Sequence, residues 1–220
     1  MSSPIQGRSS MDIQATVEKH REILPHLLAA HGLSGCDTVA TYHGIGKGTV
    51  LKVLQKFKLS LDKLGDCNVN FDNVLAQSTA FMLACYTSSG CKSLTEAWVA
   101  MWKTKIRWSK ASAPKLASLP PTNESFLLNV LCAHLQVAVW RSALHCDPPN
   151  LNPVDCGWKD DLNGNWLPVP IHEDTPMLPE VLIRHIKCSC SSAPCCDSRR
   201  CGCRIAGLVH VLAMRTVTMS

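Results

Sequence analysis

The segment Gly44-Ile45-Gly46-Lys47-Gly48-Thr49-Val50-Leu51-Lys52-Val53-Leu54 indicates how the first half of this 220-residue chain folds. Its three glycines, at alternate positions, allow close approaches that a side chain would block. The apolar residues after them recur at helical spacing, which predicts a tight turn followed by an amphipathic helix. Amide groups at a helix start favour a phosphate oxygen, and positive charge beside them is supplied by Lys47, Lys52, Lys56 and Lys58.

Helical periodicity continues on both sides of this segment. It predicts helices over residues 12–31, 49–57, 71–85, 94–106 and from Thr122 or Asn123 to Leu144. Pro25 divides the first helix, and Thr122 or Asn123 caps the last. The last helix is apolar on most sides and is expected at the centre of the core, through Phe126, Val130, Ala133, Val137, Trp140 and Leu144. The predicted fold class is therefore mainly α, a small helical bundle.

Composition divides the chain into four parts. Residues 1–11 form a disordered tail, residues 12–146 the helical domain, residues 147–179 a Pro-rich irregular arm and residues 180–215 a Cys-rich segment. The arm is expected to contain a short hairpin at Asn163-Gly164, with Trp158 and Trp166 as anchors onto the helices.

Charge and hydropathy restrict the class of partner only weakly. The net charge of +5 permits nucleic-acid binding without arguing for it. No apolar run is long enough to span a bilayer, and no signal peptide is recognisable, so we expect no membrane partner and an intracellular location. Clustered cysteines in such a reducing compartment point to metal binding rather than to disulfides.

The cysteines fall into two groups. Seven are scattered and are interpreted as small hydrophobic residues: Cys36, Cys67, Cys85, Cys91, Cys132, Cys146 and Cys156. Six are clustered with a histidine after them: Cys188, Cys190, Cys195, Cys196, Cys201, Cys203 and His210. Thiolates hold zinc tetrahedrally in structural sites, and seven ligands suffice for two zinc ions that share one thiolate. The remaining histidines show no catalytic or metal-ligand spacing and are read as surface or capping residues.

The glycine segment, together with Gly35-Cys36-Asp37 before it, resembles the helix–hairpin–helix of the 5′-nuclease (flap endonuclease, XPG-like) family. The resemblance covers residues 33–64. It implies a hairpin that grips the DNA backbone through Gly44, Ile45, Gly46, Lys47, Gly48 and Lys52. It also implies a monovalent cation bound by the backbone carbonyls of Gly44, Ile45 and Gly46.

Asp37 matches a carboxylate that, in this family, belongs to an acidic cluster holding two divalent metals. The rest of such a cluster lies upstream, on a sheet-containing domain that this chain lacks. A single carboxylate cannot assemble a two-metal site. Asp37 is therefore a remnant metal-ligand candidate, or simply a loop or helix cap, and we predict no nuclease activity for this chain alone.

The cysteine cluster resembles the tesmin-type CXC domain over residues 187–210. The resemblance implies structural zinc and DNA binding. Between the cysteines, three arginines can reach phosphates or a narrow minor groove: Arg199, Arg200 and Arg204. His210 stands where that family has a cysteine, and Met214 and Val217 stand where further cysteines are expected, so the family's full zinc cluster is incomplete here.

Together these features resemble a family of mobile-element-derived animal proteins, of which this chain is the C-terminal part. The resemblance implies a nuclear protein that binds DNA non-specifically and carries a structural zinc cluster. Three alternatives remain. The chain completes a metal site with a missing catalytic domain, it is a protein-interaction module that uses the zinc knot and the arm, or it is a relic without activity.

Overall fold

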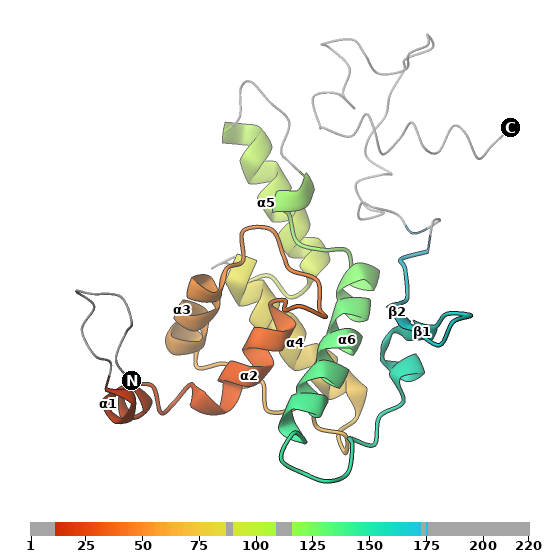
Figure 1. Cartoon of the computed structure of the whole chain (residues 1–220). Helices are drawn as coiled ribbons and strands as arrows, with labels where there is room; N and C mark the ends of the chain where they lie inside the picture. Colours follow the sequence, from red (N-terminus) through yellow and green to blue (C-terminus); the bar gives the residue numbers. More distant parts are fainter. Residues whose placement is uncertain (1–11, 87–89, 109–115, 173–174, 176–220) are drawn as a thin grey trace, which may run out of the picture.

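The computed structural model describes residues 12–86, 90–108, 116–172 and 175. Helices dominate this part of the chain, which confirms the mainly α fold class (Figure 1). The helices are α1 (Ile13–Lys19), α2 (Leu24–Leu33), α3 (Lys47–Phe57), α4 (Phe71–Tyr86), α5 (Leu94–Trp108) and α6 (Asn123–Arg141). Short 3-10 helices η1 (Leu116–Ser118) and η2 (Pro153–Cys156) and the strands β1 (Trp158–Asp160) and β2 (Trp166–Pro168) complete the described elements.

Local signals mark the starts of three helices. Asp12 caps α1 by accepting a hydrogen bond from the Ala15 amide at 3.0 Å, and Thr122 caps α6 through the Ser125 amide at 3.4 Å. The helix predicted over residues 12–31 is interrupted before Pro25, between the end of α1 and the start of α2. Pro25 lies in the first turn of α2, where its missing N–H costs nothing. Helix α6 ends at Arg141, so the prediction that Leu144 belongs to the core is wrong, and its side chain is 98% exposed.

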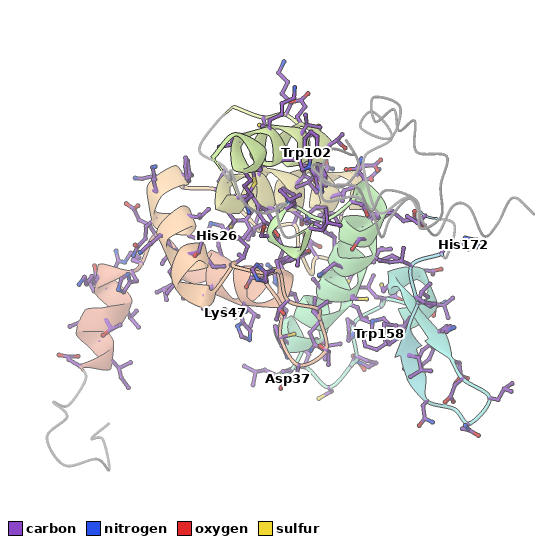
Figure 2. The ribbon with its side chains drawn as sticks, turned by 90° about the horizontal axis from the view of Figure 1, so that it is seen from above. His26, Asp37, Lys47, Trp102, Trp158 and His172 are labelled. Carbon is purple, nitrogen blue, oxygen red and sulfur yellow. The ribbon has the colours of Figure 1, made fainter. Side chains whose placement is uncertain are left out.

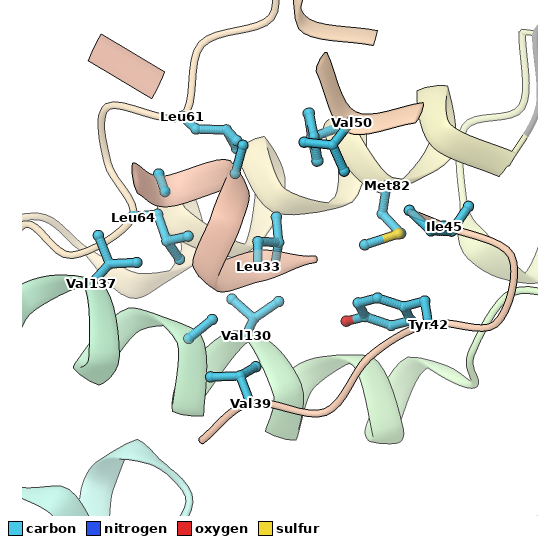
Figure 3. Close-up of a cluster of buried hydrophobic side chains, with 14 of the residues drawn as sticks. Leu33, Val39, Tyr42, Ile45, Val50, Leu61, Leu64, Met82, Val130 and Val137 are labelled. Atoms are coloured by element: carbon cyan, nitrogen blue, oxygen red, sulfur yellow. The ribbon is translucent and has the colours of Figure 1, made fainter. Parts of the chain in front are cut away.

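Helices α2, α3, α4 and α6 surround one hydrophobic core. Leu33 of α2, Leu64 of the α3–α4 connection and Val130 of α6 are fully buried in it (Figure 3). Helix α6 has the central place that its apolar sequence predicts. The scattered cysteines follow their interpretation in part. Cys132 and Cys156 are buried, whereas Cys67 and Cys146 are exposed, and the hydrophobic reading is wrong for those two.

The arm contains the hairpin predicted at Asn163-Gly164. β1 and β2 pair antiparallel with Trp158 opposite Pro168, and the Asp161 carboxylate accepts hydrogen bonds from the Asn163 and Asn165 amides at 2.8 Å. Trp158 packs against the core as expected. The prediction that Trp166 anchors the arm onto the helices is wrong, because its side chain remains 48% exposed on β2.

No helix in the described ranges is both long enough and apolar enough to cross a bilayer.

Candidate nucleic-acid interface

The loop between α2 and α3 is held firmly in place although it has no regular structure. Three of its apolar side chains enter the core at every third position: Val39, Tyr42 and Ile45. Gly35 begins the loop with φ of +101°, and a Cβ there would lie 2.6 Å from the Thr41 Cα, so only glycine fits. The hairpin glycines are therefore presented on an anchored backbone.

The surface around the hairpin glycines is open. A Cβ built on Gly44, Gly46 or Gly48 meets no atom within 4 Å. Gly46 is the N-cap of α3 and offers no side chain to the amides of the first turn. A helix start without a capping side chain leaves N–H groups for an external acceptor such as a phosphate oxygen.

Two lysines lie in line with this open helix start. Gly48, Lys52 and Lys56 are spaced by four residues and all are exposed, so they share the outer face of α3. The Lys56 ammonium lies 4.9 Å from the Phe57 ring centroid, and the Lys58 ammonium pairs with Glu22 at 3.2 Å on the surface. Lys52 thus has the position best suited to a phosphate bound at the helix start.

Lys47 has a different role from the phosphate contact that the sequence suggested. Its ammonium turns back onto the end of α2 (Figure 2). It donates hydrogen bonds to the His31 carbonyl at 2.8 Å, the Ser34 hydroxyl at 2.8 Å and the Gly35 carbonyl at 2.5 Å. Partial burial lowers the pKa of this ammonium. Since three acceptors use its three donors, the side chain joins α2 to α3, and only its backbone amide faces the helix start.

The backbone geometry also bears on the predicted monovalent cation. The Gly46 carbonyl accepts hydrogen bonds from the amides of Thr49 at 2.9 Å and Val50 at 3.2 Å. Both lone pairs of that oxygen are therefore engaged in the first turn of α3. A cation at the hairpin would have to rely on the carbonyls of Gly44 and Ile45.

Asp37 lies exposed in the loop after α2, at the edge of the helical body (Figure 2). Beside it, the Thr38 hydroxyl donates to the Gln136 side chain at 2.5 Å, which ties the loop to α6. No group of three or more His, Cys, Asp or Glu side chains suited to a metal occurs in the described part of the chain. Asp37 therefore belongs to no such group there.

The predicted zinc and arginine residues of the C-terminal segment lie outside the described residues. These are Cys188, Cys190, Cys195, Cys196, Cys201, Cys203, His210, Arg199, Arg200 and Arg204.

Charge is distributed unevenly along the sequence. The described ranges contain thirteen lysines and arginines and thirteen aspartates and glutamates, so the whole excess of +5 belongs to the other residues. The described arm contains four aspartates and one lysine: Asp147, Asp155, Asp160, Asp161 and Lys159. Attraction of a polyanion to the helical body must therefore come from a local arrangement such as the outer face of α3.

Two polar residues that organise this region were not recognisable from sequence. His134 is 5% exposed and lies within α6, and its Nδ1 accepts a hydrogen bond from the Gly65 amide of the α3–α4 connection at 2.9 Å, so the prediction of a surface or helix-capping role is wrong for this residue. The Tyr42 hydroxyl is buried and has no hydrogen-bond partner among the described residues. The Gly65 amide is distant from His134 in the sequence. No local pattern therefore marks either His134 or Tyr42 as a buried polar residue.

No protein-family model, curated protein or solved structure matches this chain.

Proposed function

We propose that this chain binds DNA through its phosphate backbone, at the N-terminal end of α3. The open surface over Gly44, Gly46 and Gly48 carries the proposal, because it leaves the amides of Lys47 and Gly48, which begin α3, to a phosphate oxygen. The aligned backbone dipoles of the helix favour an anion at this end. Lys52, one turn further along the same face, neutralises the next phosphate charge.

The hairpin contact is independent of base sequence. Backbone amides and a lysine read phosphates, which carry no sequence information directly. The Lys47 ammonium contributes indirectly, because it fixes the loop that presents the glycines. In the C-terminal segment, the cysteines and His210 would hold structural zinc, and Arg199, Arg200 and Arg204 would add phosphate contacts.

The test is fluorescence anisotropy with plain duplex and flap DNA over a salt series. Lys52→Gln is expected to weaken binding and to reduce the salt slope by about 1, since one phosphate contact is removed. Lys159→Gln is the matched control, because it removes the same charge from the arm. Equal effects of the two substitutions would show that only net charge matters and would contradict the hairpin proposal.

A second substitution tests the helix start itself. Gly48→Asp is accommodated sterically, since nothing lies within 4 Å of the added Cβ. It places a carboxylate where the phosphate would bind, and a carboxylate there also suits the helix dipole. We expect DNA binding to fall while the thermal midpoint stays unchanged or rises. Undiminished binding would refute the hairpin contact.

A second candidate function is protein binding by the arm. Three apolar side chains of the arm are between 44% and 48% exposed: Trp166, Leu167 and Ile171. Leu162 is fully exposed in the turn between β1 and β2. Exposed apolar groups gathered on one short segment are typical of a protein contact. DNA binding that is absent at low salt would favour this interaction module over the hairpin proposal.

A further inference from the structure

An apolar groove of about 860 Å³ runs along the outer face of α4. Its α4 side is formed by Leu75, Ala76, Thr79, Ala80, Leu83 and Ala84. Phe57 and Leu59, at the end of α3, line it from the other side. Phe57 remains 39% exposed, so the described part of the chain leaves this apolar surface largely open to water.

The charged groups of the groove lie at its two ends. Asp72 lines it in the first turn of α4, and Lys92 lines it beyond the last turn. Asp72 and Tyr86 are 14 residues apart in α4, which is about 21 Å of helix, so the two charges are well separated. Neither has an ion-pair partner among the described residues. The lining therefore has an acidic residue at one end, an apolar middle and a basic residue at the other end; the Glu96 carboxylate, which accepts a hydrogen bond from the Lys92 amide at 2.8 Å, lies outside the lining.

We propose that this groove binds the α4 face of a second copy of the chain, in an antiparallel two-fold dimer. A two-fold contact requires a surface that is complementary to itself. If the axis passes Thr79, residues at equal distances on either side meet, so Leu75 lies opposite Leu83 of the second copy. In the same register the acidic end of one groove faces the basic end of the other. Asp72 and Lys92 then form two ion pairs.

Side-chain size and hydrogen bonding at the centre suit close helix packing. Ala76 and Ala80 let the two backbones approach, while Leu75 and Leu83 supply apolar area. The Thr79 hydroxyl already donates to the Leu75 carbonyl at 2.7 Å. It can be buried in the interface without losing its hydrogen bond, so the centre of the contact carries no unsatisfied donor.

Sedimentation velocity of the full chain, without nucleic acid and over a concentration series, tests the dimer. We expect a monomer–dimer equilibrium that Ala80→Arg weakens about tenfold or more, because two like charges meet at the axis. Ala100→Arg is the matched control, since Ala100 is exposed on α5 and does not line the groove. A wild-type chain that is monomeric at every concentration, or equal effects of the two arginines, would overturn the proposal.

Charge exchange tests the antiparallel register. Asp72→Lys and Lys92→Asp should each weaken the dimer, and the double variant should restore it. A structural role in the monomer would not produce this rescue. A double variant that associates no better than either single variant would overturn the proposed pairing. The absence of DNA from the experiment keeps its outcome separate from the hairpin proposal.

Discussion

The buried His134 makes the stability of this fold depend on pH in a direction that can be worked out. Its Nδ1 accepts a hydrogen bond from the Gly65 amide at 2.9 Å. The centroid of its ring lies 5.9 Å from that of the Phe71 ring, in an edge-to-face contact. A nitrogen that accepts a hydrogen bond carries no proton, so the folded state holds the neutral ring. Burial is the main cause that lowers the pKa of His134, and Arg141 lowers it further, while Asp66 acts in the opposite sense.

The sign follows from proton binding in the two states. In the unfolded chain the pKa of this histidine is about 6.5. As the pH falls below that value, the unfolded state takes up a proton before the folded state does. The free energy of unfolding therefore decreases toward acid, by up to about 1.4 kcal/mol per pH unit between the two pKa values. The contribution is fully present above about pH 6.5.

Two substitutions separate the hydrogen bond from the titration. His134→Asn can offer a carboxamide oxygen where Nδ1 lies, so the Gly65 amide keeps an acceptor that does not titrate. His134→Leu removes the acceptor and leaves a buried N–H unsatisfied, which costs about 1–3 kcal/mol. Gly65 packs directly against α6, since a Cβ there would lie 2.6 Å from the Val137 side chain.

Urea unfolding from about pH 7.5 to about pH 5 provides the measurement. The difference between wild type and His134→Asn should shrink toward acid, because only the wild type loses stability through this ring. Asp62 does not confuse the comparison. Hydrogen bonds from Ser60 and Gln77 hold the pKa of its carboxyl below its usual range, so its effect appears at lower pH. A difference that is constant with pH, or equal unfolding free energies of the Asn and Leu variants at neutral pH, would refute the reasoning.

Four further outcomes are expected. Lys47→Met should cost about 1–3 kcal/mol, because it leaves the His31 and Gly35 carbonyls without their donor, whereas Lys52→Met on the open face should change stability by less than about 0.5 kcal/mol; equal effects in chemical denaturation would contradict the link between α2 and α3. Tyr42→Phe should stabilise the fold by about 1 kcal/mol, since it removes a buried hydroxyl without a partner, and a clear loss in the same assay would mean that this hydroxyl is bonded. Native mass spectrometry of the reduced full chain should detect bound zinc, and a metal-free mass would argue against the cysteine cluster as a zinc site. Flap DNA should remain uncut with magnesium or manganese; cleavage that Asp37→Ala abolishes would overturn the expectation that this chain has no nuclease activity.

Local patterns in the sequence are sufficient to predict the helices and their order. The apolar periodicity predicts α3, α4, α5 and α6 to within a few residues of their ends. This is possible because the residues that form one face of a helix recur every three or four positions in the sequence. Thr122 as a cap and Asn163-Gly164 as a hairpin turn are equally local signals. The glycine hairpin and the lysines of α3 were also found this way, together with the exposed position of Lys52.

Which polar groups stabilise the fold depends on contacts that form when the helices pack together. In the sequence, Lys47 is indistinguishable from the other lysines of α3. Its three hydrogen-bond acceptors come within reach only when α2 packs beside α3. His134 and Gly65 are 69 residues apart, so no pattern within one helix connects them. The open groove on α4 likewise depends on which of its faces the core left uncovered. Helix periodicity is a property of neighbours in sequence, whereas burial and hydrogen-bond partners are properties of neighbours in space.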